Sequence, residues 1–192
     1  VSDALQILIN LDHRGACGCE VNTGDGAGIL LQVPHDFLVK VTAPLGFKLP
    51  APGQYGVGML FLPKDSTERE AVKAEVAKIV AAEGQTVIGW RDVPTDNSSL
   101  GQTAIASEPF MAQVFVGRNP AITNDDAFER RLFIIRKQAT QRIRYGGTIP
   151  GGKWFYVSSL SARTIIYKGM LLTEQMAKYY PDLRDEAMVT AL

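Results

Sequence analysis

The chain has 192 residues, of which 46% are hydrophobic and 21% are charged, a composition that is typical of a globular domain and argues against disorder. Lysine and arginine together number 20, as do aspartate and glutamate, so the net charge is zero. Proteins that bind nucleic acids or anionic membranes usually carry an excess of basic residues. We therefore expect neither kind of partner.

Hydropathy and cysteine content indicate in which cellular compartment the protein is expected. No apolar run approaches the roughly 20 residues that span a bilayer, and no basic segment followed by an apolar block resembles a secretion signal. The two cysteines, Cys17 and Cys19, are separated by one residue, a spacing that strains a mutual disulfide and fits a reducing compartment. These features predict a single soluble domain of the cytoplasm or an organelle.

The first predicted element is a helix that Ser2 or Asp3 caps and that ends in the glycine-rich region from residue 15 to 18. Its apolar stripe consists of Ala4, Leu5, Leu8, Ile9 and Leu11. Further strands are predicted over residues 27–33, 55–62, 86–91 and 110–116, and further helices over residues 36–42, 65–84 and 124–146.

Beyond these elements, residues 154–159 and 163–167 alternate like the two strands of a β-hairpin. Residues 94–101 are a predicted polar loop, 173–179 a short helix and 187–192 a final strand. Some strands are joined through long helices and others directly, which predicts a layered α/β or α+β domain.

The richest motif lies near the front, where L-D-H-R-G-A-C-G-C (residues 11–19) is followed by N-T-G-D-G-A-G-I-L (residues 22–30). A nucleotide-binding α/β domain is one alternative, but no lysine follows Gly28 as in a P-loop. The glycines also lead into a strand, which is the wrong order for a dinucleotide fingerprint. A tight turn between helix and strand accounts for them without any ligand.

Single polar residues of this region have structural explanations as well as functional ones. His13 and Arg14 suit the C-terminal end of a helix, where cations stabilise the last carbonyls. Asp25, between two glycines, suits an Asx turn. Cys17 and Cys19 have poor zinc spacing, and with His35 as the other histidine no catalytic triad can be assembled. No metal site is predicted.

The helix predicted over residues 124–146 carries a basic face. With zero net charge, this face is either solvated or a docking surface for the rest of a larger protein. The basic residues are Arg130, Arg131, Arg136, Lys137, Arg142 and Arg144.

The H-R-G and D-G-A-G-I elements (residues 13–15 and 25–29) resemble those of the class II glutamine amidotransferases. The C-G-C-E stretch (residues 17–20) and the later S-L-S-A-R-T-I-I-Y-K-G-M segment (residues 159–170) are most similar to the glutamate synthase branch of that family. The resemblance covers nearly the whole chain, with its motifs in family order.

This resemblance implies an α+β fold, the four-layer αββα sandwich of N-terminal-nucleophile hydrolases, here truncated at both ends, so that residues 1–192 form a partial amidotransferase domain. The family's nucleophile is an N-terminal cysteine that attacks the side-chain amide of glutamine, and it would lie upstream of Val1. The family's glutamine-binding arginine and oxyanion-hole residues would lie beyond Leu192. No catalytic residue is therefore assigned to this chain. The resemblance places active-site support at Arg14, Gly15, Asp25, Gly26 and Gly28, with Arg14 orienting the cysteine.

The resemblance also implies partners and cofactors. The substrate is glutamine, and the ammonia released meets 2-oxoglutarate in a distant region that carries FMN and an iron–sulfur cluster, outside this chain. Other domains of the same protein, and a reductase small subunit or ferredoxin, are expected partners, in a bacterial cytoplasm or a plastid stroma. The isolated chain is expected to be inactive. The alternative is an amidotransferase-like scaffold or binding domain that has lost catalysis.

Overall fold

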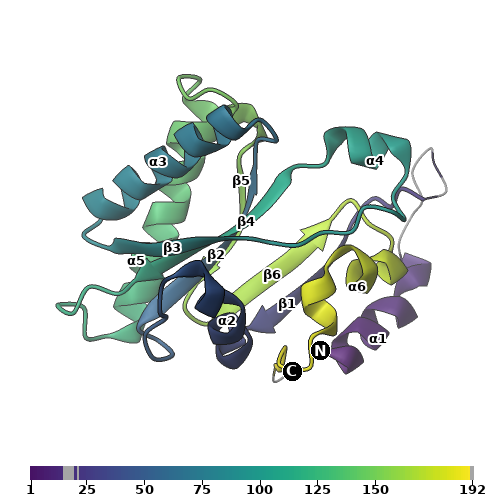
Figure 1. Ribbon diagram of the computed structural model, residues 1–192, viewed down its shortest axis with the longest axis horizontal. Coiled ribbons are helices and arrows are strands. Elements are labelled where there is room, and N and C mark those ends of the chain that lie inside the picture. The colour runs from purple at the N-terminus through teal and green to yellow at the C-terminus, as the bar shows by residue number, and fades with distance from the viewer. Residues whose placement is uncertain (15–19, 21, 191–192) are drawn as a thin grey trace.

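The computed structural model describes residues 1–14, 20 and 22–190, and its helices and strands alternate along the chain as far as β5, which β6 follows directly (Figure 1). The helices are α1 (Ser2–Asn10), α2 (His35–Thr42), α3 (Ser66–Ala82), α4 (Gln102–Ser107), α5 (Asp125–Ala139) and α6 (Met176–Tyr179). The strands are β1 (Ala27–Gln32), β2 (Tyr55–Leu62), β3 (Thr86–Asp92), β4 (Phe110–Gly117), β5 (Tyr156–Ser161) and β6 (Thr164–Gly169).

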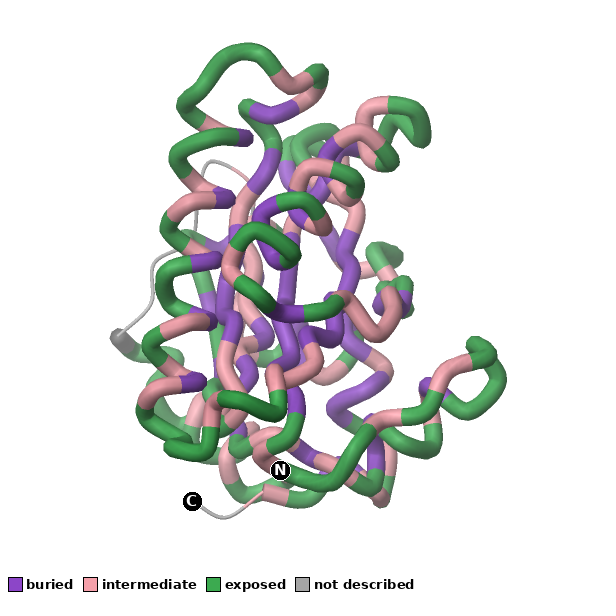
Figure 2. Tube along the Cα trace, turned by 90° about the vertical axis from the view of Figure 1, so that its left-hand side faces the viewer, coloured by how far each residue is buried: buried purple, intermediate pink, exposed green. Residues whose placement is uncertain are grey.

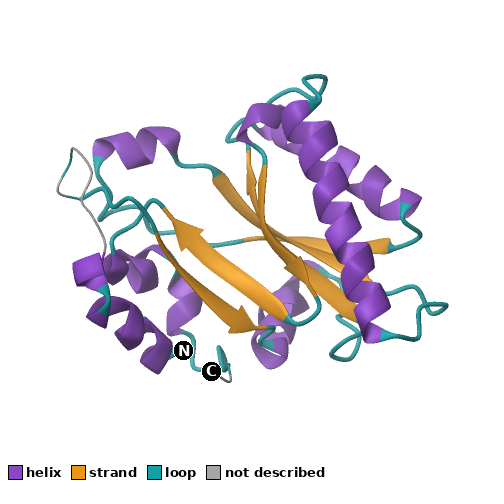
Figure 3. Cartoon of the chain, turned by 180° about the vertical axis from the view of Figure 1, so that it is seen from behind, coloured by secondary structure: helices purple, strands orange, loops and turns teal. Residues whose placement is uncertain are grey.

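These strands form two antiparallel sheets, one of four strands in the order β3–β4–β2–β5 and one of two strands, β1–β6. Helices α3 and α5 lie on one side of the sheets, whereas α1 and α6 lie beside β1 and β6 (Figures 1 and 3). The arrangement confirms the predicted α+β sandwich. No helix in the described ranges is long and apolar enough to cross a membrane.

The outer helices α3 and α5 begin where their capping residues predict. The Asp65 carboxylate accepts a hydrogen bond from the Glu68 backbone N–H at 2.9 Å, and the Asn124 side chain accepts one from Ala127 N–H at 3.1 Å. Both helices bury one apolar stripe against the four-stranded sheet, and their opposite sides are exposed (Figure 2). The buried residues of these stripes are Val72, Val76, Ile79, Val80, Phe128, Leu132, Ile135 and Ala139.

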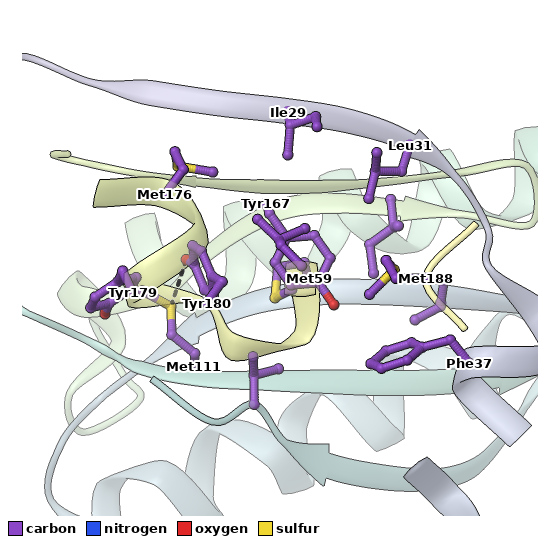
Figure 4. Packing of buried hydrophobic residues seen from close by; sticks show 14 of the residues in the cluster. Ile29, Leu31, Phe37, Met59, Met111, Tyr167, Met176, Tyr179, Tyr180 and Met188 are labelled. Atoms are coloured by element: carbon purple, nitrogen blue, oxygen red, sulfur yellow. Dashed lines mark hydrogen bonds between the residues drawn. The ribbon is translucent and has the colours of Figure 1, made fainter. Parts of the chain in front are cut away.

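A second core fills the space between the two sheets and is rich in methionine and tyrosine (Figure 4). Within it the Arg91 guanidinium of β3 donates two 2.7 Å hydrogen bonds to the Asp182 carboxylate. Gln113 of β4 accepts a third hydrogen bond from Arg91 and donates one to the phenolic oxygen of Tyr167 in β6. The Tyr167 hydroxyl in turn donates to Asp182 at 3.0 Å. This buried network links both sheets to the chain near its C-terminal end.

The predicted β-hairpin is wrong, because β5 and β6 follow one another but belong to different sheets. The serine-rich sequence of β5 explains the difference. Ser159 Oγ accepts a hydrogen bond from Ile166 N–H at 3.1 Å, and Ser158 Oγ donates to the Ile166 carbonyl at 3.3 Å. Side chains thus hold the two strands together in place of a backbone ladder. At the corner, Glu129 of α5 accepts hydrogen bonds from Ser161 Oγ and Ala162 N–H.

Three other predictions need correction. The first α-helix stops at Asn10, before a 3-10 turn over Asp12–Arg14, and it leaves Ile9 and Leu11 exposed. Helix α4 directly follows the predicted polar loop and was not expected. Residues 187–190 form no strand, because the backbone N–H groups of Ala187 and Met188 both bond to Asp185 and close a turn. Residues 191–192 lie outside the described ranges.

Candidate functional site

The glycine-rich turn before β1 approaches other backbone more closely than any side chain would permit. A Cβ atom added to the buried Gly24 would lie 2.4 Å from the Leu171 carbonyl oxygen, and one added to Gly28 would lie 2.8 Å from the Lys168 Cβ. Gly26 has a φ of +139°, a backbone conformation that residues other than glycine rarely adopt. The turn therefore needs its glycines in order to lie against the segment from Lys168 to Leu172.

This turn opens onto a cavity of about 820 Å³. Asp25, Gly26 and Gly28 line one side of it, so the structure brings together three of the predicted support residues. Other walls come from β5, β6 and α4, far apart in the sequence. A concave site of this size that is formed by several elements is the usual form of a small-molecule site.

The remaining predicted residues are placed less fully. Arg14 ends the 3-10 turn Asp12–Arg14, and its side chain is not described. Gly15 lies outside the described residues, as do Cys17 and Cys19. His13 Nδ1 lies 3.1 Å from the Asn10 carbonyl oxygen, which supports a capping role. His35 does not line the cavity. Its Nδ1 lies 3.0 Å from the Tyr55 hydroxyl.

Part of the cavity lining carries cations that are held by aromatic rings and carbonyls. Lys168 of β6 donates a 2.6 Å hydrogen bond to the Tyr156 hydroxyl of β5 and lies 4.4 Å from the centre of that ring. Lys153 lies over the Trp154 ring, and Arg144 donates to the Phe155 carbonyl. Since none of these three cations forms a salt bridge within the described ranges, this part of the lining is electropositive.

The acidic groups of the cavity lie elsewhere on its lining. Glu108, which follows α4, accepts a 2.8 Å hydrogen bond from the Tyr179 hydroxyl. Burial raises the pKa of Tyr179, so this phenol stays a donor throughout the physiological range. Asp25 is exposed on the turn. The cavity lining therefore includes both cationic and acidic side chains.

The acid of the C-G-C-E stretch has a structural role. The Glu20 carboxylate accepts hydrogen bonds from the Thr103 backbone N–H at 3.1 Å and from the Thr23 hydroxyl at 2.9 Å, at the beginning of α4. The Thr103 backbone bond is the main reason why the pKa of Glu20 is lowered. Gln175 donates to the carbonyls of Asn22 and Ser99. The motif region is therefore fastened to α4 and to the chain before α6.

In the described ranges, no group of three or more histidine, cysteine, aspartate or glutamate residues is placed so that it could hold a metal ion. The cavity lining offers hydrogen-bonding and charged groups.

The profile of the glutamine amidotransferases class II matches residues 1–192, which is the whole chain. The chain belongs to the class II glutamine amidotransferases. Its two antiparallel sheets with helices agree with the N-terminal-nucleophile hydrolase fold of that family.

This amidotransferase chain is similar to glutamate synthases throughout its length. It is 42% identical to the glutamate synthase [NADPH] large chain of Bacillus subtilis over 100% of its own residues and 12% of that protein. It is 37% identical to the glutamate synthase [NADH] of Schizosaccharomyces pombe, covering 99% of the chain and 9% of that protein. For the ferredoxin-dependent glutamate synthase 2, chloroplastic, of Arabidopsis thaliana, the identity is 38%, over 97% of the chain and 11% of the relative. The chain thus spans about an eighth or less of the length of these relatives.

Two residues of the turn and the cavity lining were given no role from the sequence. Gly24 makes the closest backbone approach of the turn, and its position in T-G-D-G was the available signal. Lys168 belongs to the Y-K-G-M segment, which carried the family resemblance without a residue role. The contact of Lys168 with Tyr156 connects two sheets, and a local sequence pattern cannot predict such a contact.

Proposed function

We propose that this chain is part of the glutaminase domain of a glutamate synthase and that its cavity is the side of the glutamine site formed by the glycine-rich turn. The observation that carries the proposal is that the D-G-A-G segment, which the family resemblance singles out, lines a cavity with both cationic and acidic groups. Free glutamine carries an α-carboxylate and an α-ammonium group, which suit those charges.

The proposed reaction is nucleophilic. A cysteine thiolate outside residues 1–192 attacks the carboxamide carbon of glutamine, the C–N bond breaks, and ammonia leaves after gaining a proton. Water then hydrolyses the thioester, which frees glutamate and restores the thiol. In this scheme Gly26 and Gly28 keep the turn close to β6, and Arg14 with Gly15 supports the position of the cysteine. Asp25 contributes a charged group to the cavity rim.

The redox half of a glutamate synthase needs groups that we place outside this chain. An iron–sulfur cluster is usually held by four cysteine thiolates, whereas the sequence contains two cysteines. FMN and the cluster would belong to other parts of a longer polypeptide, where the ammonia reacts with 2-oxoglutarate. The electron donor would be a reductase subunit or ferredoxin, and the setting a bacterial cytoplasm or a plastid stroma.

The proposal is tested by the kinetics of glutamine hydrolysis in the longer polypeptide, with Gly28→Ala as the variant. The added methyl group meets the Lys168 Cβ at 2.8 Å, so β6 must move away from the turn. A displacement of about 1 Å at an active site can cost roughly 100-fold in rate, and we expect kcat/KM for glutamine to fall by 10- to 100-fold.

Gly46→Ala is the matched control, because Gly46 lies in a loop with φ +81° and has no atom within 4 Å of an added Cβ. It should keep kcat/KM close to the unsubstituted value. Equal kinetics for both variants would contradict the placement of glutamine beside the turn. A longer polypeptide without any glutamine hydrolysis would favour a scaffold instead.

A further inference from the structure

Helix α5 has two opposite faces that differ in more than burial. Phe128, Leu132, Ile135 and Ala139 face the four-stranded sheet and are buried. On the other side, at spacings of three and four residues, lie Arg130, Phe133, Ile134 and Lys137, which we call the outer α5 stripe. All four are exposed, Phe133 by 55% and Ile134 by 38%. The outermost face of a peripheral helix is ordinarily polar, so two adjacent large apolar side chains there are unusual.

The cations of the outer α5 stripe are not held by ion pairs within the part of the chain that the structure describes. Neither Arg130 nor Lys137 forms an ion pair with a residue that the structure describes. Lys137 instead lies 5.7 Å from the centre of the Phe133 ring. The acidic residues of the same helix are engaged elsewhere, because Asp125 binds Arg118, Asp126 binds Arg163, and Glu129 binds Ser161.

On helix α3, the other helix on this side of the sheets, lysines are paired with glutamates of the same helix. Its two lysines, the half-buried Lys73 and the exposed Lys78, are paired within the helix, Lys73 with Glu70 at 3.1 Å and Lys78 with Glu75 at 3.3 Å. The difference between the two helices indicates that the positive charge of α5 is left for a group outside the described fold.

We propose that the outer α5 stripe docks onto an acidic protein surface with an apolar centre, and that this surface belongs to the remainder of the longer polypeptide. Charge complementarity defines the chemistry, with carboxylates facing Arg130 and Lys137 and an apolar depression receiving Phe133 and Ile134. The length of the relatives identifies the occupant, since this chain covers 12% or less of them. The inference is independent of the glutaminase proposal, because the stripe does not line the cavity.

The test is the acetylation rate of individual lysines in the intact longer polypeptide, measured by mass spectrometry. Lys48, which is exposed and forms no ion pair with a residue that the structure describes, serves as the internal reference. An amine that a docked surface covers and pairs with carboxylates reacts more slowly than a solvated amine. We expect Lys137 to react severalfold more slowly than Lys48.

The double variant Phe133→Ser, Ile134→Ser removes the apolar half of the stripe and should restore the reactivity of Lys137. Leu45→Ser, which removes another exposed apolar side chain at 46% exposure, should not. Equal reactivity of Lys137 and Lys48 would overturn the proposal. So would protection that appears only with anionic lipid vesicles, or that depends on protein concentration as contact between two copies requires.

Discussion

The buried glycine of the turn, Gly24, shows how a single missing side chain positions the site. Its Cα faces the Leu171 carbonyl, so that an added Cβ would lie 2.4 Å from backbone atoms that cannot rotate away. We expect Gly24→Ala to lower the free energy of unfolding by about 3 kcal/mol, the upper range for overpacking. Gly46→Ala, strained only by its positive φ, should cost about 1 kcal/mol. Urea denaturation of both variants measures the difference, and equal losses would show that the close approach is absent.

The Arg91–Asp182 pair offers a second test at the scale of single residues. Removing one partner leaves a charge buried without compensation, which typically costs 3–5 kcal/mol, and we expect about that loss for Asp182→Asn. Replacing both residues by apolar ones, as in Arg91→Met with Asp182→Leu, should recover much of the loss. The same denaturation experiment checks both variants. A neutral Asp182→Asn would mean that water reaches the pair.

At the scale of elements, the two outer helices depend on single capping side chains. Loss of an N-cap acceptor costs about 1 kcal/mol. Asp65→Ala and Asn124→Ala should each reduce the unfolding free energy by that amount, whereas Asp65→Asn and Asn124→Asp should have small effects because the side-chain acceptor is kept. Denaturation midpoints distinguish the two pairs. Equal midpoints for the alanine and the conservative variants would exclude these caps as the cause.

Elements with a local cause were predictable from the sequence, and elements with a remote cause were not. Asp65 and Asn124 lie next to the helices that they begin, so α3 and α5 were placed correctly. Helix α4 is only six residues long, and the N–H group of Thr103 in its first turn is satisfied by Glu20, more than 80 residues away. The separation of β5 from β6 similarly depends on Ser159 and on Glu129 of another element. A strand pattern cannot show which sheet a strand joins.

The candidate site also has a part that was predictable from the sequence and a part that was not. Asp25, Gly26 and Gly28 are close in sequence, and they line the cavity together. The Lys168–Tyr156 contact depends on how two sheets approach each other, and no spacing in the sequence reports it.

For the whole molecule, buried tyrosines predict the response to alkaline pH. Burial raises the phenol pKa of Tyr55, Tyr167, Tyr179 and Tyr180 above the ordinary value of about 10. Because the folded state favours the neutral phenol, this stabilisation is complete below pH 10 and is lost as the pH rises through the folded pKa values. Each such group weakens the fold by about 1.4 kcal/mol per pH unit in that window.

Phenolate absorbance recorded together with circular dichroism tests this prediction. Four of the six tyrosines should ionise only as the helical signal disappears. If all six ionised while the fold persisted, the buried environment of these phenols would be wrong.

We propose that this chain supplies the turn-bearing part of a glutamine-hydrolysing site. Ammonia release from glutamine, compared between the longer polypeptide and residues 1–192 alone, tests this proposal. We expect glutamine-dependent ammonia release by the longer polypeptide, and none above background by residues 1–192. Hydrolysis by residues 1–192 alone would contradict the position of the nucleophile, and no hydrolysis by the longer polypeptide would contradict the glutaminase function itself.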